Sequence, residues 1–163
     1  MLPPGVIRWG PDVNKVRVFL TVDVEMWPPA WGADLGSHQE AFRRYVHGVG
    51  NPPRYGLPYQ LKVLADHGLK GVFFVEPLFA SVLGRGALEE VVGLIRESGQ
   101  DLQLHLHPEW LGRARSPELP GPHRLALRHM TLGDQTWLIR LGRRWLEKAG
   151  AEPIQAFRAG GFG

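Results

Sequence analysis

The sequence predicts an α/β fold in which parallel β/α repeats build the sheet. Short apolar, β-branched segments alternate with longer segments whose apolar residues recur at helical spacing. Glycines follow two of the helical segments, at Gly68 and Gly99, as is common at helix ends. Such alternation is typical of a parallel sheet, either open or closed into a barrel. The 163 residues are enough for one hydrophobic core, so we treat residues 1–163 as a single domain.

The predicted elements follow in order along the chain. Strands are expected at residues 15–22, 71–75, 101–106 and 154–158, and helices at residues 37–47, 58–67, 87–98 and 134–149. Ser37, with Glu40 three positions later, is the expected N-cap of the first helix. Residues 27–57 form a long loop insertion rich in aromatic residues, Pro and Gly, and loops of this length are usually functional.

Composition excludes several classes of protein. The chain has no cysteine, so any metal must be held by His, Asp or Glu. No apolar run approaches ~18 residues and no secretory signal is present, so we expect a cytoplasmic protein with no membrane partner. Basic residues are in excess between positions 113 and 148, but no nucleic-acid motif accompanies them. We therefore expect no nucleic-acid partner.

Ionisable residues gather at the ends of the predicted strands. Asp23 and Glu25 follow the first strand, His105 and His107 close the third, and Arg158 ends the fourth. The carboxyl ends of parallel strands meet at one edge, where α/β proteins place their sites. Residues two apart on a strand point to the same side, so each of the two pairs shares a face. Imidazoles and carboxylates together are typical ligands of a divalent metal that activates water for hydrolysis.

These segments resemble the polysaccharide deacetylase family, the NodB-like carbohydrate esterases. Residues 21–25 (Thr-Val-Asp-Val-Glu) are similar to the Asp-x-Glu variant of its first motif, and residues 67–75 resemble the stretch leading into its second strand. Residues 99–105 match the approach to its histidine motif, and residues 157–163 resemble its arginine motif. The resemblance covers nearly the whole chain from Val16 onward. It implies the N-terminal part of a deformed NodB-like (β/α) barrel.

The resemblance also implies an activity and a set of residue roles. The chain would be a hydrolase that removes acetyl or other acyl groups from amino sugars or polysaccharides by attack of metal-activated water. Asp23 would be the catalytic base, and Arg158 would pair with it and orient it. Glu25, His105 and His107 would bind the divalent metal, with zinc expected and nickel, cobalt or manganese as alternatives.

The chain departs from the family's pattern at three points. Val24 stands where the family has its metal-binding Asp, so Glu25 is expected to take over that role. The second family histidine stands four residues after the first, where this chain has Glu109, so the further ligand is either His107 or Glu109. The family's domain continues beyond the arginine motif and carries its general-acid histidine there. We therefore expect this chain to be an N-terminal portion.

The expected partner is a carbohydrate or a small acylated amine. We place Trp27, Trp31, Glu109 and Trp110 beside this substrate, and the two loop tryptophans either stack on sugar rings or pack the loop against the core. An unfinished parallel sheet has an open edge, which predicts a homo-oligomer that covers it. The alternative function is a catalytically incomplete deacetylase-like fragment that binds metal or carbohydrate without turnover.

Overall fold

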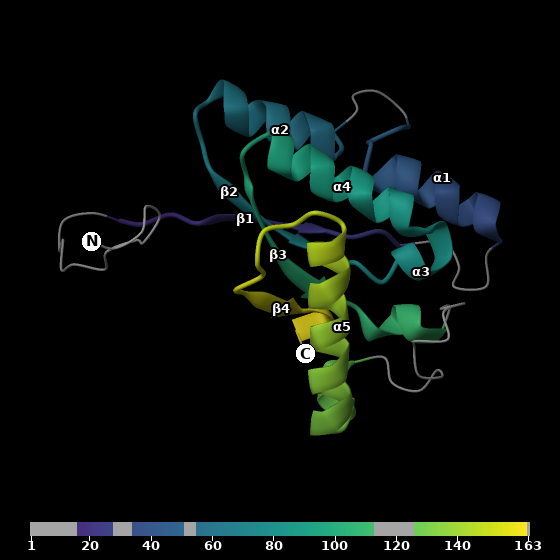
Figure 1. The fold of residues 1–163 in the computed structure, drawn as a ribbon. Helices are drawn as coiled ribbons and strands as arrows, with labels where there is room; N and C mark the ends of the chain where they lie inside the picture. Colours follow the sequence, from purple (N-terminus) through teal and green to yellow (C-terminus); the bar gives the residue numbers. More distant parts are fainter. Residues whose placement is uncertain (1–15, 28–33, 51–54, 113–125, 163) are drawn as a thin grey trace.

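Four parallel strands form the sheet, and their order across it is their order along the chain (Figure 1). They are β1 (Leu20–Val24), β2 (Gly71–Val75), β3 (Asp101–Leu106) and β4 (Phe157–Ala159). The computed structural model describes residues 16–27, 34–50, 55–112 and 126–162. The sheet is curled like half of a barrel, and the predicted α/β class with parallel β/α repeats is confirmed.

Helices connect successive strands. They are α1 (Leu35–Tyr45), α2 (Leu57–Asp66), α3 (Ala80–Leu83), α4 (Arg85–Glu97) and α5 (Leu132–Lys148), with short 3-10 helices η1 (Pro108–Gly112), η2 (Leu127–His129) and η3 (Gly160–Phe162). Figure 1 shows α1, α2 and α4 grouped on one side of the strands and α5 beside β3 and β4. The helices predicted at 58–67, 87–98 and 134–149 are confirmed to within two residues. No helix in the described ranges is long and apolar enough to cross a membrane.

The first strand lies later in the chain than predicted. β1 begins at Leu20, whose register partner is Gly71 at the start of β2, and it ends at Val24. Residues 16–19 precede the first pairing position, and their apolar side chains are exposed, Val16 at 91% and Val18 at 78%. The prediction of residues 15–22 was wrong because β-branched composition does not reveal where the neighbouring strand begins. As a consequence, Asp23 lies within the strand, and Glu25 directly follows it.

The first helix also begins earlier than predicted, inside the long loop insertion of residues 27–57. Asp34 is its N-cap, and the Oδ1 atom of Asp34 accepts a hydrogen bond of 2.8 Å from the backbone N–H of Ser37. Ser37 is therefore the residue that donates to the cap, and its prediction as the cap itself was wrong. A carboxylate at the N-cap satisfies a backbone N–H that has no partner within the helix.

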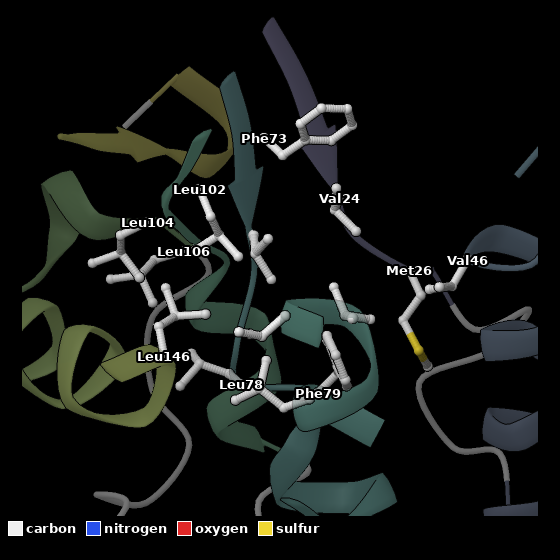
Figure 2. Packing of buried hydrophobic residues seen from close by; sticks show 14 of the residues in the cluster. Val24, Met26, Val46, Phe73, Leu78, Phe79, Leu102, Leu104, Leu106 and Leu146 are labelled. Carbon is white, nitrogen blue, oxygen red and sulfur yellow. The ribbon is translucent and has the colours of Figure 1, made fainter. Parts of the chain in front are cut away.

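One face of the sheet carries the hydrophobic core. Side chains alternate along each strand, so every second residue faces the covering helices. Figure 2 shows Val24, Phe73, Leu102, Leu104 and Leu106 of this face together with Leu146 of α5. Burying a Leu or Phe side chain contributes roughly 1.5–3 kcal/mol to folding, so this face holds the sheet to its helices.

Gly142 lets α5 approach β3 closely. A Cβ atom at this position would lie 2.9 Å from Cδ2 of Leu106 and 3.0 Å from Cδ1 of Leu104. Both distances are shorter than van der Waals contact, so a larger residue would push the helix away from the strand. Leu138 and Leu141 of the same helix are buried as well.

Gln103 fixes β4 against β3. Its Oε1 atom accepts hydrogen bonds from the backbone N–H groups of Gln155, at 2.9 Å, and Ala156, at 2.7 Å. Its Nε2 atom donates to Asp101 at 3.0 Å. Because Gln103 is 8% exposed, these bonds form in a largely dry environment, where they are stronger than at the surface. They hold the segment that delivers Arg158 to the edge of the sheet.

Candidate metal centre

Glu25, His105 and His107 converge at the carboxyl ends of β1 and β3. The Oε2 atom of Glu25 lies 3.1 Å from Nε2 of His105 and 2.7 Å from Nε2 of His107. The two Nε2 atoms are 3.0 Å apart. Ligands bound to one ion at roughly 2.0–2.2 Å are themselves about 3 Å apart, so this triangle has the size of one face of a coordination sphere. The group could hold a metal ion.

The sheet register explains why these residues meet. Val24, Val75 and Leu104 occupy one row across β1, β2 and β3, so Glu25 and His105 follow in the next row. His107 lies two residues beyond His105 and points to the same side. The face on which they lie is opposite to the hydrophobic core. This face of the sheet therefore carries the candidate metal ligands, whereas the other face carries the hydrophobic core.

Each imidazole is held through its second nitrogen. The Nδ1 atom of His105 lies 2.9 Å from the backbone carbonyl oxygen of Arg158. A carbonyl oxygen can only accept, so Nδ1 carries a proton, and Nε2 is the nitrogen that a metal would bind. The Nδ1 atom of His107 faces Oε2 of Glu109 at 3.4 Å, which favours the same tautomer. Both rings thus direct Nε2 toward Glu25, so that in a metal-bound form the two Nε2 lone pairs would face the ion.

In the metal-free triangle the negative charge of Glu25 lies next to the positive charge of His107. Burial raises the pKa of Glu25, but hydrogen bonds with His105, His107 and Trp27 outweigh it and hold that pKa well below its usual range. Burial lowers the pKa of His107, but its contacts with Glu109 and Glu25 raise it to about 9. The metal-free site thus holds an ionised carboxylate next to a protonated imidazole. A divalent cation bound there would take the place of that proton.

Trp27 contacts the candidate ligands directly. Its Nε1–H donates to Oε1 of Glu25 at 3.1 Å, which leaves Oε2 for the histidines. Its ring meets the ring of His107 edge-on, with centroids 4.7 Å apart. Sequence reasoning placed Trp27 beside a substrate, and the structure places it against the site's own residues. Trp31, the second tryptophan of that prediction, lies outside the described residues.

Asp23 and Arg158 form a second pair on the same face. The Nη1 atom of Arg158 donates to Oδ1 of Asp23 at 2.6 Å, and each side chain is 35% exposed. The Cζ atom of Arg158 lies 4.1 Å from the centroid of the Phe74 ring, so the guanidinium rests on an aromatic surface. This contact fixes the arginine above β2 and leaves a carboxylate that is open to a bound molecule.

Sequence reasoning missed Glu76, which is completely buried beside the site. Its Oε1 and Oε2 atoms accept from the backbone N–H groups of Leu78 at 2.9 Å and Phe79 at 3.0 Å. Burial outweighs these bonds and a further one from the backbone of His107, and it raises the pKa of Glu76 to about 8. The signal in the sequence was its position: Glu76 follows β2 as Glu25 follows β1. The carboxyl group ties the end of β2 to His107.

Gly160 leaves the space that the His107 ring occupies. A Cβ atom on Gly160 would lie 2.5 Å from both Cε1 and Nε2 of His107. The imidazole therefore rests directly on the glycine backbone, and no other residue leaves that space free. Gly160, the first residue of η3, thus supports one candidate ligand, and the backbone carbonyl of Arg158 in β4 supports another.

The remaining predicted site residues lie around this centre. Glu109 contacts the far side of the His107 ring and does not belong to the donor triangle. Of the two residues expected as the further ligand, His107 is therefore the one in the group that could hold a metal ion. Trp110 is 1% exposed and packs in the core, with its ring centroid 6.0 Å from that of His38. Its predicted place beside a substrate does not fit this burial, because a stacking ring must be accessible.

Comparison of the chain with protein-family models, with curated proteins and with solved structures finds no match. The class of protein is therefore defined by the fold and the site alone. The chain is an α/β protein whose parallel sheet carries two histidines and one carboxylate that could hold a metal ion.

Proposed function

We propose that this protein is a metal-dependent hydrolase that removes acyl groups from amino sugars. The observation that carries the proposal is the triangle of Glu25, His105 and His107, whose donor atoms lie 2.7–3.1 Å apart on the face that also holds Asp23 and Arg158. Two imidazoles and one carboxylate are the protein ligands of several catalytic zinc sites. Zinc is the metal that we expect, with nickel, cobalt or manganese as alternatives.

The donor set suits a catalytic ion better than a structural one. Structural zinc sites are usually closed by four protein ligands, whereas catalytic sites keep positions open for water and substrate. A metal at this site would lower the pKa of a bound water to roughly 7 and polarise an acyl carbonyl group. Three donors from the described residues leave room for both.

The neighbouring pair supplies the acid–base chemistry of the proposal. Asp23 and Glu25 lie two residues apart, so their Cα atoms are about 6–7 Å from each other. In this proposal Asp23 accepts a proton from a water next to the ligands, and its closeness to Glu25 supports that role. Arg158 holds Oδ1 of Asp23 at 2.6 Å and leaves the second carboxylate oxygen for this transfer. The guanidinium is itself fixed by the Phe74 ring, so the base has a defined orientation.

The proposed substrate rests on the resemblance to the polysaccharide deacetylases. Residues 21–25, 99–105 and 157–163 resemble that family's motifs, and each of these segments contributes to the face described above. An amide of an acylated amino sugar is the bond that such a site would hydrolyse. A small acetyl ester is a useful second substrate, because its leaving group needs little protonation.

The test is a hydrolysis assay with metal-stripped and zinc-reloaded chain, using 4-nitrophenyl acetate and an N-acetylglucosamine oligomer. We expect zinc-dependent acetate release that His105→Ala abolishes. Asp23→Asn should keep the zinc and lose roughly 10²- to 10⁴-fold in turnover, since it removes only the general base. Asp66→Asn, in an exposed helix-surface pair with Lys62, is the matched control and should behave as wild type.

Two results would contradict the proposal. Turnover that is independent of added metal would show that the activity does not depend on a metal bound by Glu25, His105 and His107. Zinc binding without turnover of either substrate would assign the site to metal binding alone, which is the alternative function of a catalytically incomplete module.

A further inference from the structure

We propose that Glu109 is a positioning residue that sets the tautomer of His107, so that the Nε2 lone pair of His107 faces the metal. This inference rests on the metal centre of the proposed function and names a residue outside its ligand set. Oε2 of Glu109 lies 3.4 Å from Nδ1 of His107, on the opposite side of the ring from Oε2 of Glu25. Glu109 therefore acts on the imidazole and not on the ion.

The two facing atoms have no other partner in the described part of the chain. Nδ1 of His107 and Oε2 of Glu109 are both buried, and neither forms a hydrogen bond with a further group. A buried polar atom without a partner destabilises the fold, so buried polar atoms usually face a group that can bond with them. The 3.4 Å contact between them is an ion pair outside hydrogen-bond geometry, and a proton on Nδ1 would lie on the side of the ring that faces the carboxylate.

The backbone holds Glu109 in this place. It lies in η1, the short helix that starts at Pro108, directly after β3. The N–H of Trp110 donates to the carbonyl oxygen of His107 at 3.2 Å, and the Trp110 side chain is anchored in the core at 1% exposure. These two contacts thus fix the backbone turn between His107 and Glu109. The Glu109 side chain itself is 19% exposed, so it is largely shielded from competing water.

The position of the ring is already fixed by other residues. Trp27 packs against one edge of the His107 ring, and Gly160 lies against Cε1 and Nε2. What remains undetermined is which ring nitrogen keeps the proton once the imidazole is neutral. For His105 the backbone carbonyl of Arg158 makes that choice, and no substitution of a side chain removes it. For His107 the choice depends on the Glu109 side chain, so it can be changed by mutation.

The experiment measures zinc affinity by competition with a chelator in the wild type, Glu109→Ala and Glu109→Gln. Removing a carboxylate that orients a metal-binding histidine typically weakens metal binding by about 10- to 100-fold, which is the loss that we expect for Glu109→Ala. Glu109→Gln keeps an oxygen that accepts from Nδ1–H and should lose less. Glu90→Ala is the matched control, since Glu90 contacts His47 at 3.2 Å outside the site and its removal should not change the affinity.

A second readout follows the tautomer directly. Long-range ¹H–¹⁵N spectra of the zinc-free chain, at a pH at which His107 is neutral, should show Nδ1 of His107 protonated in the wild type and in Glu109→Gln. In zinc-free Glu109→Ala at the same pH this nitrogen should lose its fixed protonation, while Nδ1 of His105 keeps its proton. If Glu109→Ala does not fold, Glu109→Gln and its spectra decide the question.

The outcomes separate this inference from the proposed function. An affinity of Glu109→Ala equal to that of the wild type overturns the inference and leaves the metal centre intact. A loss in Glu109→Gln as complete as in His107→Ala overturns it as well, because Glu109 would then be a ligand itself. Zinc binding that responds as predicted, without hydrolysis of any substrate, supports the inference and contradicts only the hydrolase.

Discussion

The Nε2 atoms of His105 and His107 lie 3.0 Å apart and share Oε2 of Glu25 as a neighbour. Two imidazole lone pairs and an ionised carboxylate repel one another at this distance unless a positive charge lies between them. In the metal-free chain that positive charge is a proton on His107, whose pKa is about 9. The arrangement therefore favours the binding of a cation in its place.

Zinc binding should release a proton from His107. Below its pKa of about 9 this imidazole is protonated, and a metal can bind only its neutral form. The apparent zinc affinity should consequently fall as the pH is lowered from 9 to 7, by about tenfold per pH unit for one competing proton. Calorimetric titrations in two buffers with different ionisation enthalpies measure the proton release. Equal heats in both buffers at pH 7 would count against this account.

Gly160→Ala should weaken metal binding with little effect elsewhere. The added methyl group would lie 2.5 Å from Nε2 of His107, so the ring must leave its place in the triangle. Gly142→Ala provides the contrast, because its methyl group would meet Leu104 and Leu106 in the core. Overpacking of this kind costs about 1–3 kcal/mol of folding free energy. Thermal unfolding and zinc titration of both variants should show a loss of affinity in the first and a loss of stability in the second.

Arg158→Lys should separate turnover from metal binding. His105 contacts the backbone carbonyl of residue 158, which any substitution retains, so zinc affinity should stay near that of the wild type. Lys cannot reproduce the planar contact with Phe74 together with the hydrogen bond to Asp23, so the base loses its orientation. We expect a fall in kcat. A parallel loss of zinc from this variant would show that the side chain contributes to the centre itself.

Glu76→Gln should change the pH dependence of stability. The folded chain raises the pKa of Glu76 from 4.5 to about 8, so it favours the protonated acid. This contribution is fully present below pH 4.5 and is lost as the pH rises through 8. The free energy of unfolding of the wild type, relative to that of Glu76→Gln, should therefore decrease between pH 5 and pH 8. Urea unfolding in the presence of a chelator measures it, and an increase over the same range would refute the prediction.

Much of the fold could be predicted because local pattern and tertiary structure agree in β2 and β3. Residues 71–75 and 101–106 are apolar runs with clear boundaries, and both predictions match the structure. β1 could not be placed in this way, since residues 15–19 have the same β-branched composition as the strand. Only the pairing of Leu20 with Gly71 determines where that strand begins.

The candidate site was predictable where it depends on strand geometry. The spacing of two residues between His105 and His107, and the position of Glu25 after β1, were sufficient to group them. Contacts between distant segments were not predictable in the same way. The ring of His107 on Gly160 and the carboxyl of Glu76 beneath His107 both depend on the curl of the sheet, which no local pattern encodes. Trp110 was misplaced because η1 turns its side chain into the core.

X-ray absorption spectroscopy at the zinc edge of the zinc-loaded chain tests most directly whether Glu25, His105 and His107 bind one metal ion. The account predicts a single class of zinc with two imidazole ligands and light oxygen or nitrogen atoms at about 2.0–2.2 Å. In His105→Ala and His107→Ala the imidazole scattering should fall and the zinc should be lost on dialysis. In His67→Ala, an exposed histidine outside the site, the spectrum should be unchanged. Zinc without imidazole scattering in the wild type would contradict the account.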